Sequence, residues 1–326
     1  MKNKALITGC AGFIGSHLAE FLILHGWKVI GIDSFTDYYD RTIKEANLSA
    51  LRTHPDFELI DGDLLEISPE SYLKETDYIF HNAGQPGVRG SWGKKFNLYV
   101  QNNILATQRL LEAAKEYPIK KFVYASSSSV YGNTDLFPMQ ENHLPQPFSP
   151  YGVTKLAGEQ LCLLYYQNYR FPVVALRYFT VYGPRQRPEM AISAFIRAMK
   201  KNKAFTVYGD GSQLRDFTFI HDIVRANLLA AKSAITGSVL NIGSGDPRSI
   251  SDVISILEKE FAKIARINYQ KTHVGDVKGT FADISKAQQI LNYKPSITIE
   301  QGLAYQIDEN NLSYLSQNFH NSLSIE

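Results

Sequence analysis

The sequence predicts an α/β protein with a doubly wound parallel sheet and a smaller C-terminal α/β lobe. Short apolar runs recur up to residue 178, with helical patterns between them. A glycine-rich segment follows the first run and opens the first helix. Apolar strands that alternate with helices form right-handed crossovers, so helices are expected on both faces of a parallel sheet.

The predicted elements follow one another in that alternation. The first helix is FIGSHLAEFLILHG, residues 13–26, and a polar helical stretch ends at about residue 52. The expected strands are KALIT (4–8), WKVIGID (27–33), FELIDGD (57–63), DYIFHNA (77–83), KKFVYASS (120–127) and VVALRYF (173–179).

The alternation breaks after residue 178, where a second lobe is predicted. Loops are expected at 180–190, which is rich in Arg, Pro and Gly, and at 208–219, and helices are expected at 250–264 and 283–291. The run SVLNIGSG, 238–245, is expected to return to the main sheet. We therefore expect a dinucleotide-binding domain of residues 1–178 plus about 218–246. A substrate lobe of about 179–217 and 247–326 closes over the carboxyl ends of the strands.

Composition excludes several classes of function. The 326 residues carry a net charge of +2 without a basic tract, so no nucleic-acid partner is expected. No run of 18 apolar residues exists, so no membrane span is expected, and the N-terminal segment is interpreted as strand and loop rather than a signal peptide. Two cysteines, Cys10 and Cys162, form no disulfide framework, which favours a reducing, cytoplasmic location.

Three glycines, Gly9, Gly12 and Gly15, open the first helix in the pattern G-x-x-G-x-x-G. Glycine is needed where a backbone turns tightly, approaches a pyrophosphate, or lets a helix pack on a strand. The helix N-terminus then offers free N–H groups and its positive dipole end to phosphate. The trio alone is weak evidence. With a strand before it and Asp33 at the end of the second strand, it predicts a dinucleotide site.

Asp33 favours NAD over NADP as the cofactor. Its carboxylate can accept both hydroxyls of the adenosine ribose and would repel a 2′-phosphate; the alternative is a strand-end turn residue. In DGDL, residues 61–64, Asp63 is expected to accept from the adenine amino group, unless the segment is a plain turn. Asn103 is expected to order backbone near the cofactor. The predicted cofactor contacts are Gly9, Gly12, Phe13, Ile14, Gly15, Asp33, Asp63, Leu64, Asn103, Tyr151 and Lys155.

Tyr151 and Lys155 form a Tyr-x-x-x-Lys pair within SPYGVTKLAGEQL. Positions i and i+4 share one face of a helix, so the ammonium is expected beside the phenol. Tyrosine ionises near pH 10, and an adjacent cation with a positively charged nicotinamide ring would lower the pKa of Tyr151. Such pairs occur by chance, but here a dinucleotide motif precedes this one and four serines, 126–129, end the fifth strand.

At these motifs the chain resembles the extended short-chain dehydrogenases/reductases (SDR), which have a Rossmann fold, and among them the nucleotide-sugar 4-epimerases. The resemblance runs from Lys4 to about residue 305. It rests on GCAGFIGSHL, DGDL, YASSSSVYG, SPYGVTK, LRYFTVYGPRQRPEM and YGDGSQLRDFTFIHDIV. The branch it resembles contains the bacterial UDP-glucuronic acid 4-epimerases and their UDP-glucose relatives. This implies bound NAD, a UDP-sugar substrate and a homodimer formed by helices within 95–117 and 150–170.

The resemblance also implies the reaction. Aligned on VYG, the catalytic serine or threonine of the family falls on Ser127. Its hydroxyl would bond the C4 oxygen of the sugar and help to relay or orient the proton that Tyr151 removes. Hydride leaves C4 for NAD⁺, and the 4-keto sugar turns over and takes the hydride back on its other face. The predicted catalytic residues are therefore Ser127, Tyr151 and Lys155.

The two residues before VYG separate epimerases from related lyases. Similar 4,6-dehydratases carry Asp-Glu there, and similar UDP-glucuronate decarboxylases carry Glu immediately before VYG. This chain has Ser128 and Ser129. A hydroxyl without an activating base is a poor acid or base near neutrality, so dehydration and decarboxylation are the disfavoured alternatives.

The expected reaction is the interconversion of UDP-glucuronate and UDP-galacturonate. Galactose-type epimerases usually have Asn after RYF, where this chain has Thr180. A C6 carboxylate could be held by Ser127, Ser128, Thr180 and Arg187, and charge-assisted bonds are about twice as strong as neutral ones. That grip would also suppress loss of CO2 from the 4-keto form, a β-keto acid. UDP-glucose/UDP-galactose is the alternative, with Arg185 and Arg187 instead binding diphosphate or forming surface salt bridges.

Further substrate contacts carry over by resemblance. Arg215, in QLRDF, matches a diphosphate-binding arginine, and Asp276, in HVGD, matches an acid that holds the uridine ribose. His273 is a departure, because many relatives place a second diphosphate arginine there. Either Arg89, in the loop after the fourth strand, substitutes for it, or the nucleotide binds less tightly. The histidines show no metal-ligand spacing, so no metal is expected.

Overall fold

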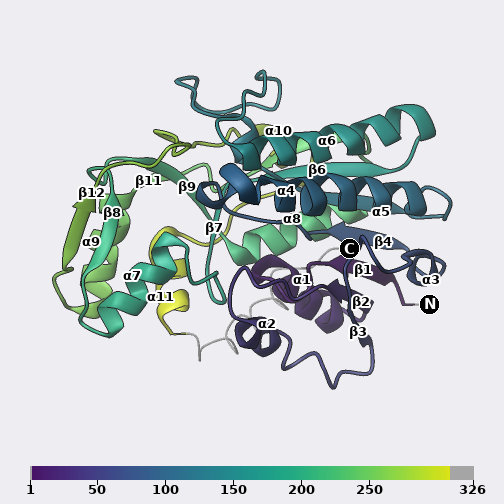
Figure 1. Cartoon of the computed structure of the whole chain (residues 1–326), viewed down its shortest axis with the longest axis horizontal. Coiled ribbons are helices and arrows are strands. Elements are labelled where there is room, and N and C mark those ends of the chain that lie inside the picture. The colour runs from purple at the N-terminus through teal and green to yellow at the C-terminus, as the bar shows by residue number, and fades with distance from the viewer. Residues whose placement is uncertain (1, 309–326) are drawn as a thin grey trace.

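Seven parallel strands form the main sheet, in the order β10-β6-β5-β4-β1-β2-β3. Of these strands, Figure 1 labels β6, β4, β1, β2 and β3. The computed structural model describes residues 2–308. The strands are β1 (Lys4–Thr8), β2 (Lys28–Asp33), β3 (Phe57–Asp61), β4 (Tyr78–His81), β5 (Lys121–Ser127), β6 (Val173–Tyr178) and β10 (Ser238–Ile242). The six predicted strands are confirmed with small shifts at their ends, and the run 238–245 does return to this sheet, beside β6.

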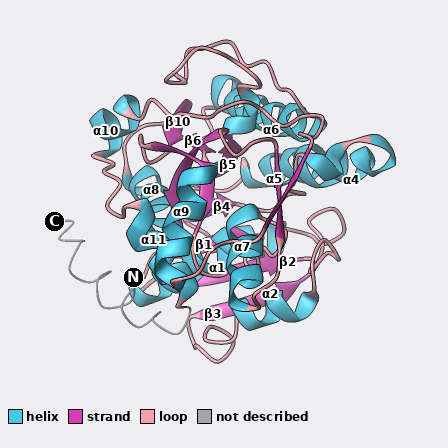
Figure 2. Ribbon diagram, turned by 90° about the vertical axis from the view of Figure 1, so that its left-hand side faces the viewer, coloured by secondary structure: helices cyan, strands magenta, loops and turns pink. Residues whose placement is uncertain are grey.

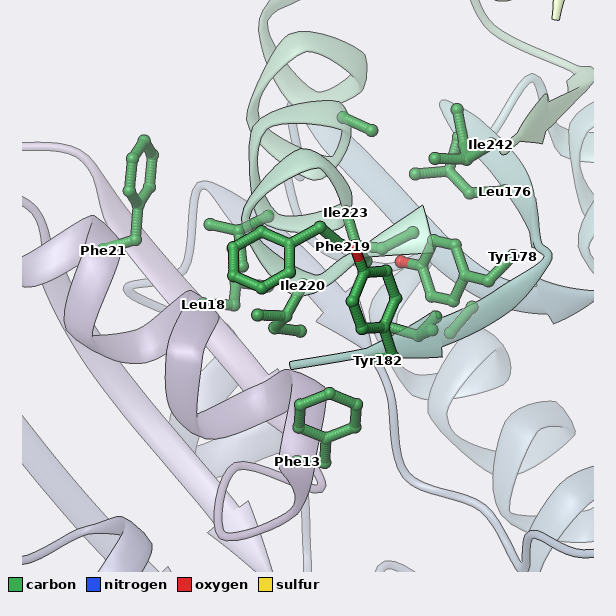
Figure 3. Packing of buried hydrophobic residues seen from close by; sticks show 14 of the residues in the cluster. Phe13, Leu18, Phe21, Leu176, Tyr178, Tyr182, Phe219, Ile220, Ile223 and Ile242 are labelled. Carbon is green, nitrogen blue, oxygen red and sulfur yellow. The ribbon is translucent and has the colours of Figure 1, made fainter. Parts of the chain in front are cut away.

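Helices cover both faces of the sheet, as the doubly wound prediction requires. Alternate residues of β5 point to opposite faces. Val123 and Ala125 join the core under α1 (Phe13–Leu24) and α8 (Ile220–Lys232), whereas Phe122 and Tyr124 join the core under α5 (Ala106–Ala114) and α6 (Pro150–Tyr169). Figure 3 shows side chains of α1, β6 and α8 packed against one another on the first of these faces.

Short helices connect the strands near the site. They are α2 (Arg41–Asn47), α3 (Glu70–Leu73) and α4 (Phe96–Tyr99). Between α4 and α5 the chain forms a π-helix at Val100–Leu105, and Asn103 lies within it. A π-helix is rare, and many mark functional sites. The helix α6 is capped by Ser149, whose hydroxyl accepts the Gly152 N–H at 3.1 Å.

The second lobe contains two small sheets. The strands β7 (Thr180–Tyr182), β9 (Leu214–Phe219) and β11 (Pro247–Ser249) form the first, and β8 (Phe205–Tyr208) pairs with β12 (Ile267–Gln270) in the second. Its helices are α7 (Ala191–Lys200), α9 (Ile250–Phe261), α10 (Ser285–Leu291) and α11 (Ile299–Ile307). Figure 2 views the molecule from the side on which α7, α9 and α11 lie in front of the main sheet.

Candidate active site

A smaller cavity of about 200 Å³ lies where β1, β2, β3, β4 and β5 end. The strand order reverses between β1 and β4, and ligands of open α/β sheets bind outside such a switch point. Ten of the eleven predicted cofactor residues line this cavity: Gly9, Gly12, Phe13, Ile14, Gly15, Asp33, Asp63, Leu64, Tyr151 and Lys155.

Two glycines of the trio occupy positions that no larger residue fits. Gly9 has a φ of +69°, and a Cβ there would lie 2.8 Å from the backbone nitrogen of Ala83 on the neighbouring β4 loop. A Cβ at Gly15 would collide with the carbonyl oxygen of Gly9. The loop thus packs tightly against both neighbours, which leaves the start of α1 open toward the cavity.

The carboxylate of Asp33 holds the glycine loop in place from the end of β2. Its Oδ2 accepts the N–H of Ala11 at 3.0 Å, and its Oδ1 accepts the N–H of Phe35 at 2.8 Å. Burial raises the pKa of Asp33, and the ammonium of Lys44 and the two N–H groups oppose that rise. Each carboxylate oxygen has two lone pairs, so Asp33 can still accept from a bound ribose.

At the end of β3, the structure separates the two acids of DGDL. Asp63 lines the smaller cavity, and its Oδ1 accepts the N–H of Leu65 at 2.8 Å. Asp61 instead forms an exposed ion pair with Arg41, with 2.6 Å between its Oδ2 and Nη2 of the arginine. Asp63 is therefore the acid that can contact a ligand here.

Asn103 is the one predicted cofactor residue that does not line the smaller cavity, because its side-chain amide is hydrogen-bonded within the protein. Its Oδ1 accepts the Gln85 N–H at 2.6 Å, and its Nδ2 donates to the Gln85 carbonyl at 3.1 Å and to Thr154 Oγ1 at 2.9 Å. Gln85 does line the cavity. Direct contact of Asn103 with the cofactor is therefore not supported, whereas its expected ordering of nearby backbone is what the bonds describe.

The polar groups that line the smaller cavity suit a dinucleotide. The side-chain nitrogen and oxygen of Asn82, which lines it, are buried and have no partner among residues 2–308. A buried amide without hydrogen bonds is costly, so it is expected to bond a ligand. With the glycine cradle and the Asp33 carboxylate, the site offers groups for a pyrophosphate and a ribose.

A larger cavity of about 680 Å³ adjoins the smaller one, and the two share Tyr151 and Arg187 among their lining residues. All seven residues predicted for the substrate line it, although they come from distant parts of the sequence. They are Arg89, Ser127, Ser128, Thr180, Arg187, Arg215 and Asp276.

Tyr151 and Lys155 lie one turn apart on α6, as predicted, and burial acts against the fall that was expected for the tyrosine pKa. Burial raises the pKa of Tyr151, while a hydrogen bond with Ser127 and the charge of Arg187 oppose the rise. Burial also lowers the pKa of Lys155, to about 8. The ammonium lies over the ring of Tyr124, 4.8 Å from its centroid. Burial therefore outweighs the effects of Ser127 and Arg187 on the pKa of the phenol, and the lowering expected from the nicotinamide charge stays a prediction.

The serines at the end of β5 divide between the cavity and the core. Ser127 Oγ accepts the Ser129 N–H and lies 3.2 Å from Ser129 Oγ, and both residues line the larger cavity. Ser126 lines both cavities but donates to the buried carboxylate of Glu159 at 2.7 Å. Ser128 and Thr180 also line the larger cavity, so the hydroxyls of all four serines and of Thr180 border the same space as Arg187.

Two neighbouring arginines take different partners. Arg185 bonds to Glu20 of α1, 2.7 Å away, and lines neither cavity, which agrees with the salt-bridge alternative for that residue. Arg187 lies at the junction of both cavities and pairs with Glu189, with 2.7 Å between Nε and Oε1. Of the two, only Arg187 can reach a ligand.

At the far end of the larger cavity, Arg89 forms an ion pair with Asp276, 2.9 Å between Nη2 and Oδ2. Its guanidinium also lies 4.0 Å from the centroid of Tyr208, and the other neighbour of that ring is His273, with the centroids 4.4 Å apart. Arg215 donates to the carbonyls of Leu214 and Val277, and burial lowers its pKa. Arg89 and His273 thus contact the same ring, so Arg89 lies near the position where the resemblance predicts an arginine and this chain has a histidine.

Sequence reasoning missed several residues of these cavities: Tyr38, Lys44, Gln85, Glu189 and Tyr208. Lys44 is buried on α2 near Asp33, and its Nζ donates to the Thr36 carbonyl at 2.8 Å. The signal for Glu189 was present in RQRPEM, where an acid follows Arg187 by two positions. Tyr208 ends β8, and Tyr38 and Gln85 lie in loops whose path the sequence pattern does not give.

No group of three or more His, Cys, Asp or Glu side chains within residues 2–308 is placed to hold a metal ion. Over the same range, none of the helices combines the length and apolar character needed to cross a bilayer.

Comparisons with known proteins agree with this site. The family model described as NAD dependent epimerase/dehydratase family matches residues 5–243. The uncharacterized UDP-glucose epimerase YtcB of Bacillus subtilis is 44% identical over 315 residues, which are 96% of this chain and 98% of that protein. The UDP-glucuronate 4-epimerase of Thermodesulfobacterium geofontis is 39% identical over 302 residues, 91% of this chain and 93% of that one.

Solved structures agree as well. The UDP-glucuronic acid 4-epimerase of Bacillus cereus, in complex with UDP-glucuronic acid and NAD, superposes with a TM-score of 0.92 and 46% identity. The match covers 95% of this chain and all of that one. The glycine loop, the Tyr-x-x-x-Lys pair and the switch-point cavity are thus accompanied by similarity over almost the whole chain. The chain belongs to the NAD dependent epimerase/dehydratase family and has the extended SDR fold.

Proposed function

We propose that this chain is a UDP-glucuronate 4-epimerase, which interconverts UDP-glucuronate and UDP-galacturonate through a 4-keto sugar. The observation that carries the proposal is the arrangement beside Tyr151. Three hydroxyls and one guanidinium, from Ser127, Ser128, Thr180 and Arg187, line the cavity that the catalytic pair borders. The segment 126–129 holds no acid that could drive the ketone toward elimination.

The cofactor proposed for the smaller cavity is NAD, which, when bound, takes a hydride from the sugar and returns it. Asp33 and Asp63 would hold the adenosine end, and the glycine loop with the start of α1 would hold the pyrophosphate. Asn103 would act indirectly, by holding Gln85 at the rim. Lys155, buried behind Tyr151, would contact the cofactor ribose on the resemblance to the family.

The proton at O4 of the sugar is the part of the reaction that the chain itself performs. Tyr151 is the base that accepts this proton and the acid that returns it, and Ser127 bonds the same oxygen and orients it. The hydrogen bond between Ser127 and Tyr151 already lowers the pKa of the phenol against the effect of burial. Below pH 8, Lys155 adds a positive charge on the same helix face.

The carboxylate of the sugar is held by Ser128, Thr180 and Arg187. Loss of CO2 requires the breaking C–C bond to align with the π system of the ketone. Bonds to both carboxylate oxygens fix the group and keep that bond out of alignment. The same contacts favour a uronate over a neutral hexose, because a charged acceptor forms the stronger bonds.

The diphosphate and uridine are assigned to the far end of the larger cavity. Arg215 is the proposed diphosphate arginine, and Arg89 supplies the second cation in place of His273. Asp276 is the proposed ribose acceptor. Its ion pair with Arg89 supports this placement, because the pair already brings the two groups together across the cavity.

The second candidate substrate is UDP-glucose, favoured by the relative named as a UDP-glucose epimerase at 44% identity. NMR of the purified enzyme with each UDP-sugar distinguishes the two. We expect fast conversion of UDP-glucuronate and slow conversion of UDP-glucose. The reverse order would contradict the proposal, and release of CO2 or of a 4-keto-6-deoxy product would indicate a lyase.

We propose two ligand-binding parts of the chain, of which residues 1–178 plus about 218–246 bind NAD. The UDP-sugar is assigned to about 179–217 and 247–326, of which 309–326 lie outside the described residues. Residues of both parts line the larger cavity, Arg89 and Ser127 from the first and Arg215 and Asp276 from the second, so the substrate would lie between the two parts. The proposed location is the cytoplasm, where the two free, buried cysteines, Cys10 and Cys162, would stay reduced.

The proposed assembly is a homodimer formed by the helices within 95–117 and 150–170. Large apolar side chains are exposed there: Leu98, Leu105, Val153 and Leu164. Light scattering on the purified protein tests this. A charged residue at Leu164 should give monomers, and a monomeric parent protein would contradict the assembly.

A further inference from the structure

Glu189 fixes the orientation of Arg187 without occupying its terminal nitrogens. The carboxylate bonds only Nε of the guanidinium, at 2.7 Å. Within residues 2–308, the structure gives neither Nη1 nor Nη2 of Arg187 a hydrogen-bond partner. A guanidinium is a planar fork of five donors. The terminal edge, which suits a carboxylate in two-point contact, therefore stays available at the junction of the two cavities.

A second side chain lies beside Arg187 and Glu189 from the other part of the molecule. Tyr38 lies in the loop between β2 and α2 and lines both cavities. The guanidinium of Arg187 lies 5.9 Å from the centroid of the Tyr38 ring. Burial raises the pKa of Tyr38, and the nearby charge of Glu189 adds to that rise. The hydroxyl of Tyr38 also packs against Gly87, where a Cβ would collide with it. Arg187 is thus bordered by Glu189 on one side and by a loop of the dinucleotide side on the other.

If only its charge mattered, Glu189 would weaken the binding of a uronate carboxylate to Arg187. A carboxylate beside Arg187 also cancels part of its charge and could compete with a uronate for it. Two observations favour positioning over competition. Glu189 is 40% exposed, so water screens its repulsion of a second anion. It also bonds the nitrogen at the base of the fork rather than the terminal pair that an incoming carboxylate would use.

We infer that Glu189 is a positioning residue, which, with Tyr38, holds Arg187 so that its terminal nitrogens face the carboxylate of the sugar. This inference rests on the proposed function, because it assigns the selectivity of that site for uronate over neutral hexose. Glu189 does not have to contact the substrate itself, because it acts through its bond to Arg187.

The test measures dissociation constants of UDP-glucuronate and UDP-glucose by calorimetric titration of the NAD-loaded protein. Glu189→Ala removes the bond to Arg187 and should weaken UDP-glucuronate binding by about tenfold, the size of one charge-assisted hydrogen bond. Binding of UDP-glucose should change by less than threefold. Glu189→Gln keeps an oxygen that can accept from Nε, so it should recover most of the uronate affinity.

A matched control is Glu20→Ala, which removes the equivalent 2.7 Å partner of Arg185 outside both cavities. It should leave the ratio of the two dissociation constants at the wild-type value. Glu189→Ala with an unchanged ratio, with tighter uronate binding, or with equal losses for both ligands would overturn the inference. So would a Gln variant as weak as the Ala variant. Turnover of UDP-glucuronate by the wild-type enzyme tests the proposed function separately.

Discussion

Glu159 of α6 and Arg177 of β6 form a buried ion pair, with 2.6 Å between Oε1 and Nη2 and 3.0 Å between Oε2 and Nε. The same carboxylate accepts the hydroxyl of Ser126 at the end of β5. Glu159 lies two turns beyond Tyr151 on α6. The pair therefore joins this helix to β6, and the bond to Ser126 joins it to β5, the strand that carries Ser127.

Removing one member of this pair should destabilise the protein strongly. Glu159→Ala leaves the guanidinium of Arg177 buried without its counter-ion, which typically costs about 3–5 kcal/mol. Urea unfolding followed by circular dichroism measures the loss. The double variant Glu159→Leu, Arg177→Met removes both charges and should regain much of the stability. A single variant as stable as wild type would show that the pair contributes little.

Tyr151→Phe should reduce turnover by about 10²–10⁴-fold, the usual contribution of a general acid or base. The ring stays in place, so NAD content and the melting temperature should remain at wild-type values. The measurement is single-turnover conversion of UDP-glucuronate. Tyr165→Phe serves as the control, because Tyr165 lies on the same helix, bonds Glu112 and lines neither cavity. Unchanged turnover in Tyr151→Phe would remove the phenol from the mechanism.

Asp33→Ala should abolish retention of NAD during purification while the fold survives. The variant also leaves the N–H groups of Ala11 and Phe35 without their acceptor, so the melting temperature should fall by several degrees. Chromatography of the nucleotide released on denaturation measures the NAD content. Asp61→Ala, at the end of the adjacent strand, should retain NAD, because Asp61 pairs with Arg41 outside the smaller cavity. Full NAD content in Asp33→Ala would exclude the assigned role.

Acid should destabilise the fold through His81. Burial lowers the pKa of this histidine to about 3, and the charge of Lys155 adds to the effect. An unfolded histidine has a pKa near 6.5, so between that value and pH 3 the unfolded chain binds the extra proton. The folded state therefore loses about 1.4 kcal/mol per pH unit on acidification from this residue alone. His81→Gln should show a shallower decline in urea titrations from pH 7 to 5, and His54→Gln is the control; equal slopes would contradict the prediction.

Ser129→Glu should divert part of the reaction to decarboxylation. Ser129 lines the larger cavity, 3.2 Å from Ser127 through their hydroxyl oxygens, so a carboxyl group there would meet the 4-keto sugar. The expected result is a UDP-pentose product, detected by NMR, together with release of CO2. Ser129→Gln has the same size without the acid and should release none. If the Glu variant folds and still gives only epimer, the absence of an acid before VYG does not decide the outcome.

The strands β1 to β6 and the Tyr-x-x-x-Lys pair were predictable from local patterns, whereas β7 and β9 lie in segments that were expected to be loops. Apolar runs place β1 to β6 with small shifts at their ends, the spacing of Tyr151 and Lys155 fixes their common helix face, and Ser127 was assigned through the family resemblance. The missed residues depend on contacts between distant segments. Tyr38 comes to lie beside Arg187 and Glu189 only after the lobes meet, and the different partners of Arg185 and Arg187 depend on how one loop crosses α1. The burial of Tyr151, which opposes the expected fall in its pKa, is not visible in the spacing of two residues.

The position of β10 in the sheet affects the order in which the protein can be completed. The strand is hydrogen-bonded to β6, yet Val173–Tyr178 and Ser238–Ile242 are separated in the chain by β7, α7, β8, β9 and α8. During synthesis on the ribosome, the edge of β6 stays unpaired until all of those segments have emerged. A nascent chain halted before Ser238 would carry an exposed, apolar strand edge, the kind of surface that chaperones bind and that aggregates form from.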